Sequence, residues 1–173
     1  GAVVVVMVVV VAFYFVNIKT ISASSNLIKA ITPNQQTGYR ESLPRFKQIL
    51  AAKTFVSSEA IEQLASLAVT VVGDKQYDDN FKKEFLTLAV DELEARTKAY
   101  PTGARALSIL GSLLRSTGNI DPALNALNQA VRASPNKQTI MFQLGQTYLS
   151  AGKIEEGIAV FKKAFELEPN FEE

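Results

Sequence analysis

Three internal pairs of adjacent carboxylates are the residues of this chain best suited to proton transfer or to cation binding. The pairs are Asp78 with Asp79, Asp91 with Glu92, and Glu155 with Glu156. Two close carboxylates can divide the roles of general acid and general base, or ligate a hard cation. All three pairs fall in predicted turns or on exposed helix faces, where a solvated surface role is favoured.

The composition lacks the residues that would assist such carboxylates. Histidine and cysteine are both absent from the 173 residues, so the usual general base near neutral pH and any thiolate nucleophile or ligand are missing. The glycine patterns of nucleotide-binding loops and of hydrolase nucleophile turns are also missing. We therefore predict that this protein is not an enzyme and has no catalytic residue, no cofactor and no metal site.

The charge balance argues against nucleic acid as a partner. The chain has 18 basic and 17 acidic side chains, for a net charge of +1, and so lacks the positive excess of a nucleic-acid binder. The expected partners are other proteins or copies of this chain.

The first stretch, GAVVVVMVVVVAFYFV, carries no charged side chain. A membrane-spanning helix needs about 20 apolar residues, and residues 2–16 form a slightly shorter run. The aromatic residues at its end, before Asn17 and Lys19, are typical of a membrane interface. Because valine is β-branched, a strand or fibril-forming segment is the alternative. We expect a helix over residues 1–18 that anchors in a membrane or assembles with its copies through Val3, Val6, Val9, Val10, Phe13 and Phe15.

The next segments are a predicted linker and a set of predicted helices. Residues 19–38 are rich in Ser, Thr, Asn and Gln and contain the breakers Pro33 and Gly38, which predicts an extended polar linker. Residues 39–101 show apolar residues at helical spacing, with Pro44 in a first turn and Ser57 or Ser58 as an N-cap. We expect degenerate helical repeats there.

A fixed period organises residues 102–173. Pro101, Pro135 and Pro169 are each separated by 34 residues, a period typical of a solenoid. Small residues between the prolines would let antiparallel helices approach closely, and large ones would fill the space between them. Aligning the units on the prolines pairs Leu107 with Met141, Leu110 with Leu144, Gly111 with Gly145, Leu114 with Tyr148, Ala123 with Gly157, Leu127 with Phe161 and Ala130 with Ala164.

These positions resemble the pattern of the tetratricopeptide repeat (TPR) family over residues 104–169. The resemblance implies an all-α protein, in which the N-terminal apolar, transmembrane-like helix precedes a short α-solenoid of antiparallel helix pairs. Two regular units would occupy residues 102–173, with Gly118 and Gly152 in left-handed turns between their helices.

The resemblance also implies a concave protein-binding groove lined by the first helix of each unit. Arginine charge and the Phe142 ring could hold an extended peptide there; the alternative is that Phe142 and Leu149 pack against a neighbouring helix. Ser108 and Ser112 replace the lysine and asparagine by which some family members bind carboxylate termini, which argues against that ligand. By the family pattern the groove residues are Arg105, Ser108, Ser112, Arg115, Thr139, Phe142, Gln146 and Leu149.

A second resemblance concerns the order of the segments. The apolar stretch, then NIKTISASSNLIKAITP, then the repeats are similar to the tail of bacterial O-antigen ligase/polymerase-like membrane proteins. This implies a glycan-transfer context whose catalytic part lies outside this chain. Because the chain starts at Gly1 and stops just after a repeat proline, we expect a processed product or a fragment.

Three functions follow as hypotheses. In the first, the apolar helices bundle and the repeats pack head to tail as a filament, since a heterologous contact that does not close gives a polymer. In the second, the protein is a membrane-anchored TPR binding domain, and in the third it is the regulatory tail of a glycan ligase or polymerase. We favour self-assembly and expect a membrane-associated, extracellular or cell-surface location.

Overall fold

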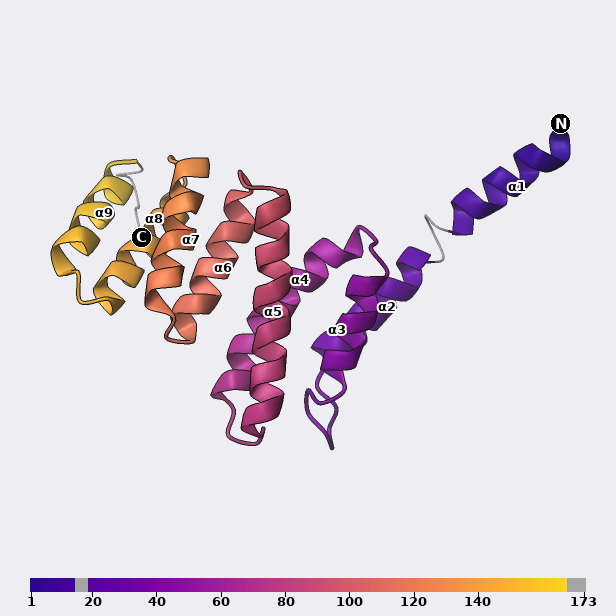
Figure 1. Ribbon diagram of the computed structural model, residues 1–173, viewed down its shortest axis with the longest axis horizontal. Helices are drawn as coiled ribbons and strands as arrows, with labels where there is room; N and C mark the ends of the chain where they lie inside the picture. Colours follow the sequence, from indigo (N-terminus) through magenta and orange to yellow (C-terminus); the bar gives the residue numbers. More distant parts are fainter. Residues whose placement is uncertain (15–18, 168–173) are drawn as a thin grey trace, which may run out of the picture. The chain divides into compact units, whose positions relative to one another are not determined.

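The computed structural model describes residues 1–14 and 19–167, and within them the protein is all-α (Figure 1). The described helices are α1 Ala2–Phe13, α2 Lys19–Ile31, α3 Ser42–Ala51, α4 Val56–Gly73, α5 Asp79–Ala99, α6 Ala104–Ser116, α7 Ile120–Ala133, α8 Gln138–Ser150 and α9 Ile154–Leu167. The chain divides into two compact units, residues 1–67 and residues 68–173.

The apolar stretch forms α1, which has 12 residues. Its residues from Val3 to Val11 are between 53% and 68% exposed, so no face of the helix is covered. Phe15 and the rest of residues 15–18 lie outside the described residues, as does the side chain of Phe13. Over the described ranges, no helix combines the length and apolar character that crossing a membrane requires. The expected transmembrane-like helix is therefore corrected to a shorter apolar one.

The predicted extended linker is wrong for residues 19–31, which form α2. Ala23, Leu27 and Ala30 are buried, and their spacing of three or four residues places them on one helix face. The Ser, Thr and Asn residues that indicated a linker fall mainly on the remaining surface. Ile28, next to the buried Leu27, points away from this face and is 64% exposed.

The helix α3 packs against α2 through the apolar face that the sequence predicts. Leu43, Phe46 and Ile49 are buried in it, and Pro44 falls in its first turn, where its missing N–H costs nothing. The predicted cap of α4 is displaced, since the helix begins at Val56 rather than after Ser57. The Ser57 hydroxyl instead donates to the Ile49 carbonyl at 3.4 Å.

The first carboxylate pair has a structural role at the start of α5. Asp78 is the N-cap residue, and its side chain accepts a hydrogen bond from the Phe81 N–H at 3.0 Å. This satisfies one of the donors left free at a helix start. Along α5, Phe85, Ala89 and Leu93 are fully buried, and their spacing of four residues places them on one helix face.

Two helical hairpins, α6 with α7 and α8 with α9, make up the regular repeats of the second unit. Gly118 and Gly152 form the turns within them with φ of +81° and +73°, the left-handed conformation that glycine tolerates. At Gly111 a Cβ atom would lie 2.5 Å from Leu127 Cγ, and at Gly145 one would lie 2.7 Å from Phe161 Cε1. The helices of each hairpin therefore touch through a glycine.

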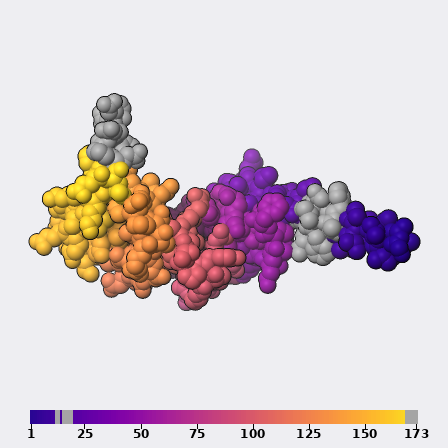
Figure 2. All heavy atoms as spheres, turned by 90° about the horizontal axis from the view of Figure 1, so that it is seen from above, coloured from indigo at the N-terminus to yellow at the C-terminus, as the bar shows by residue number. Residues whose placement is uncertain are grey.

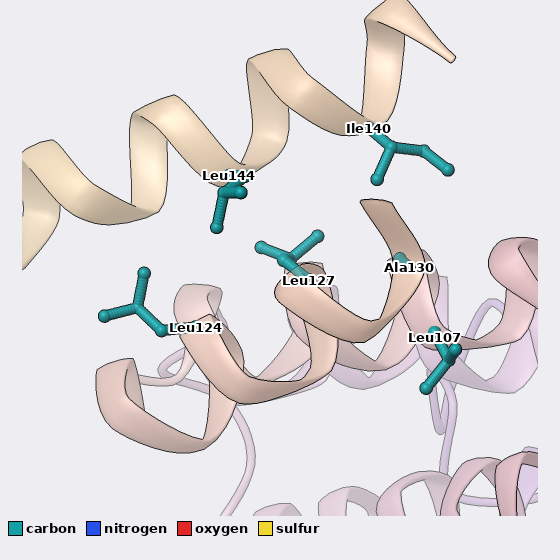
Figure 3. Close-up of a cluster of buried hydrophobic side chains, with 6 residues drawn as sticks. All are labelled: Leu107, Leu124, Leu127, Ala130, Ile140 and Leu144. Carbon is teal, nitrogen blue, oxygen red and sulfur yellow. The ribbon is translucent and has the colours of Figure 1, made fainter. Parts of the chain in front are cut away.

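A buried cluster joins the first hairpin to the second (Figure 3). It contains Leu107, Leu124, Leu127, Ala130, Ile140 and Leu144, with Ile120, Val131 and Tyr148 packed around it. Because α8 contacts both α7 and α6, the second hairpin stacks directly on the first in sequence order. The end of the stack in the second unit is α9, drawn in yellow in Figure 2.

Replacing Gly111 with alanine tests the close approach of α6 and α7. The added Cβ would overlap Leu127 and lie 3.2 Å from the Ala123 carbonyl oxygen, so Gly111→Ala should lower the free energy of unfolding by about 1–3 kcal/mol. Circular dichroism during urea denaturation measures this change. The matched control is Gly73→Ala, whose Cβ would meet no described atom within 4 Å and should change stability by no more than about 1 kcal/mol. Equal stability of Gly111→Ala and the native protein would contradict the packing.

Candidate protein-binding groove

The N-terminal halves of α6 and α8, with the connection before α8, line an open pocket of about 470 Å³ in the second unit. Three of the predicted groove residues, Arg105, Ser108 and Thr139, line it. The structure therefore brings these three predicted groove residues together at one site. We call this site the α6–α8 pocket. Its other lining residues are Ala104, Ile109, Ser134, Lys137, Ile140 and Gln143.

A hydrogen bond between the two first helices forms the floor of this pocket. The Ser108 hydroxyl donates to Gln143 Oε1 at 2.5 Å, and these residues are 35 apart in the sequence. Ser108 is only 8% exposed, so a polar group buried there needs such a partner. The bond holds the Gln143 side chain in place and leaves its amide NH₂ able to donate to a ligand.

The rim of the pocket is positively charged. Arg105 and Lys137 are its charged lining residues, and both are exposed. Lys137 is the N-cap residue of α8, and a helix N-terminus itself carries partial positive charge. With Ser134 and Thr139 adding hydroxyl groups, the pocket is suited to a polar ligand group with negative charge or several acceptors.

Two other predicted groove residues, Ser112 and Arg115, lie further along α6 and do not line the pocket. The Ser112 carbonyl accepts the Ser116 hydroxyl at 2.8 Å, which is a bond within the helix. Arg115 is half-buried, and its Nε finds no hydrogen-bond partner among the described residues. An unpaired buried donor costs about 1–3 kcal/mol, so an acceptor from a ligand or a water molecule would be favoured there.

Of the three remaining predicted groove residues, two pack against another helix and one is exposed to solvent. The Phe142 ring lies 5.8 Å from the Phe161 ring, centroid to centroid, with the planes tilted by 38°. Leu149 covers Gly157, where a Cβ would lie 2.9 Å from Leu149 Cδ2. Both residues therefore contact α9, as the packing alternative proposed. Gln146 is exposed on α8.

Lys137, Ser134 and Gln143 are pocket residues that sequence reasoning missed. Gln143 could have been found from helical spacing, because it stands one turn after Thr139 on α8. Lys137 and Ser134 lie in the connection between the two hairpins, which a search restricted to the first helices of the units excludes.

The second and third carboxylate pairs are not part of this pocket, and the described residues contain no group of three or more acidic side chains that could hold a metal ion.

A double-mutant cycle on Ser108 and Gln143 tests the bond across the pocket floor. Ser108→Ala and Gln143→Ala should each lower the free energy of unfolding, and the double variant should lose less than the sum of the two. We expect a coupling free energy of about 0.5–1.5 kcal/mol, the usual net contribution of one hydrogen bond. Urea denaturation of the four proteins measures it. Strictly additive effects would show that the bond does not hold α6 to α8.

Comparison with known proteins supports the repeat assignment. A family model described as tetratricopeptide repeat matches residues 78–137 and 110–170, which together make up more than half of the chain. The peroxisomal targeting signal receptor of Saccharomyces cerevisiae is 29% identical over 105 residues, covering 56% of this chain but 17% of the receptor. The chain thus spans about a sixth of that relative.

Solved structures show the same fold. A thermophilic TPR protein from Thermus thermophilus has a TM-score of 0.62 and 25% identity, over 76% of this chain and 66% of that one. MamA from Desulfovibrio magneticus has a TM-score of 0.59 and 20% identity, over 78% and 69%. YrrB, a TPR protein with an unusual peptide-binding site, has a TM-score of 0.56 and 20% identity, over 77% and 62%. The hairpins, their glycine contacts and the family match lead to one conclusion: this chain belongs to the tetratricopeptide repeat family.

Proposed function

We propose that this protein is a non-catalytic interaction module that binds a segment of a partner protein at the α6–α8 pocket. The observation that carries the proposal is the pocket itself, which two first helices build and one buried hydrogen bond organises. Its polar lining and two cationic side chains favour a peptide with acidic or carbonyl groups over an apolar one. YrrB is described as having a peptide-binding site, which supports a similar use of the fold here.

Charge reversal at Lys137 tests this function. Peptides selected from a random phage-displayed library on the full chain supply the probe, and fluorescence anisotropy measures their affinity. Lys137→Glu should weaken the selected peptides by about tenfold or more, because it places an acid beside the site of a bound acidic group. Lys153→Glu is the matched control, since Lys153 is an exposed lysine in the turn beyond the opposite end of α8, and it should change affinity by less than about twofold.

Two results would contradict the proposal. In the first, the library yields no peptide that binds the folded protein. In the second, the selected peptides bind Lys137→Glu and Lys153→Glu equally well, which would place the binding surface elsewhere.

A second candidate function is self-assembly through α1. A helix that is apolar on every face is normally buried inside a protein or a membrane, whereas Val3 to Val11 are all more than half exposed in the single chain. We propose that copies of α1 pack together as the apolar core of a filament. The membrane-anchored module at the cell surface and the O-antigen ligase-like context remain the alternative proposals, and apolar spans encoded upstream of Gly1 would support the latter.

Variants of Val6 distinguish these uses of α1. Val6→Asp should abolish assembly, because a charge in an apolar interior costs several kcal/mol, whereas Val6→Leu keeps the apolar surface and should assemble. Electron microscopy and sedimentation with and without detergent measure the outcome. Detergent-resistant fibres from the native chain and Val6→Leu alone would support a filament core. Particles that stay monodisperse only in detergent would support the anchor, and a detergent-free monomer would contradict both.

A further inference from the structure

The lining of the α6–α8 pocket carries positive charge that no negative charge in the lining balances. Its two charged side chains, Arg105 and Lys137, are both cations, and none of the described residues that line it is acidic. Lys137 also forms no ion pair with any residue that the structure describes. A pocket with two cations and no counter-charge favours an anionic ligand, and a ligand with two negative charges would balance it.

The neutral polar side chains of the pocket add hydrogen-bond donors to this charge. Because Ser108 donates to Gln143 Oε1, the Gln143 side chain turns its NH₂ group to other acceptors, and this group donates to no atom of the described residues. The hydroxyls of Ser134 and Thr139 likewise have no hydrogen-bond partner in the described ranges. All three groups can donate to a ligand, so the pocket is suited to an anion with several oxygen atoms.

The two helices that line the pocket begin without the acidic residues found at the other helix starts of the second unit. Neither α6 nor α8 has a side-chain N-cap hydrogen bond or an acidic residue in its first turn. The first turns of the second helices and of α5 do have them, namely Asp79, Asp121, Glu155 and Glu156. Acidic groups stabilise the partial positive charge of a helix N-terminus, whereas the cations Arg105 and Lys137 do not. A bound anion would supply the missing stabilisation.

Charge and oxygen count distinguish the two anionic groups that a peptide can offer. A carboxylate has one negative charge and two oxygens, whereas a phosphorylated serine or threonine carries about −1.5 to −2 charges at pH 7 and three acceptor oxygens. The planar guanidinium of an arginine such as Arg105 can bind two phosphate oxygens at once, which leaves the third for Lys137 and the neutral donors. The pocket therefore matches a phosphate more closely than a carboxylate.

We propose that the α6–α8 pocket recognises a phosphorylated serine or threonine in the partner segment. This inference rests on the proposed function of the pocket and adds the chemical group that the pocket reads. Arg105 and Lys137 compensate the charge of the phosphate, and Gln143, held in place by Ser108, donates to one of its oxygens. Because an unmodified chain carries no phosphate, a modified partner protein supplies the group.

Three degenerate peptide libraries that differ only in their central residue test the proposal on the full chain. The central residue is phosphoserine, serine or glutamate, and fluorescence anisotropy measures the pooled affinity at pH 7.5. The phosphorylated library should bind about tenfold or more tightly than each of the other two, because only it carries a dianion. Lys137→Gln should reduce this preference to about threefold or less, whereas the control Lys153→Gln, at an exposed lysine outside the pocket, should preserve it. Circular dichroism checks that both variants remain folded.

The pH dependence supplies a second readout. The charged lining residues are Arg105 from α6 and Lys137 before α8, and the chain has no histidine, the side chain that ordinarily titrates between pH 5 and 8. Lowering the pH from 7.5 to 5.5 should weaken the phosphorylated library by about fourfold, because a second phosphate pKa near 6 leaves about a quarter of it as the dianion. The glutamate library should change little, since a carboxyl group with a pKa of about 4.3 stays ionised.

Three results would overturn the proposal. Equal affinity for the phosphoserine and glutamate libraries would show that any acid serves, and a phosphate preference that survives Lys137→Gln would place the phosphate elsewhere. Inorganic phosphate that displaces the phosphorylated library at an equal concentration would show that the free anion is the ligand. These results differ from failure of the proposed function, in which no peptide binds at the pocket at all.

Discussion

The contact between a glycine on one helix and a large side chain on the next is the constraint on which the repeats depend. At Gly111 the side chain of Leu127 occupies the volume that a Cβ atom would need, and Phe161 does the same at Gly145. The two helices of each hairpin can therefore lie close enough for their apolar faces to exclude water. Once α6 and α7 are paired in this way, the outward side of α7 carries Leu124 toward α8, and the next hairpin stacks on it. The solenoid grows by repeating these two contacts.

This arrangement separates the surfaces that bind from the surfaces that pack. The first helices place Ser108 and Gln143 on a side that the second helices do not cover, so polar residues can gather there without weakening the core. The last helix repeats an apolar stripe that another helix covers one unit earlier. A repeat fold thus offers two different kinds of surface, a polar pocket between first helices and an apolar face at the end of a stack. The pocket proposal uses the first of them.

The first unit shows where composition misleads. Residues 19–31 are rich in the polar residues of linkers, yet Ala23, Leu27 and Ala30 recur at helical spacing and become the buried face of α2. Periodicity predicts secondary structure better than overall polarity does, because a helix needs only one apolar face to pack. The N-terminal apolar stretch shows the opposite, because its composition is informative and its periodicity is not. Its uniform valines indicate that it avoids water, but they give no periodic face that would show which surface covers it.

The sequence alone indicated the 34-residue period, the paired hairpins and the left-handed glycine turns, and its resemblance to a known family implied that Arg105, Ser108 and Thr139 line a common groove. These features depend on residues close along the chain or on their spacing, and both can be read in one dimension. Only the tertiary structure decided that Phe142 and Leu149 contact α9, that Lys137 and Gln143 complete the pocket, and that Ser108 bonds across it. Those outcomes depend on side chains far apart along the chain, whose contacts are set by how the helices stack and not by any local pattern.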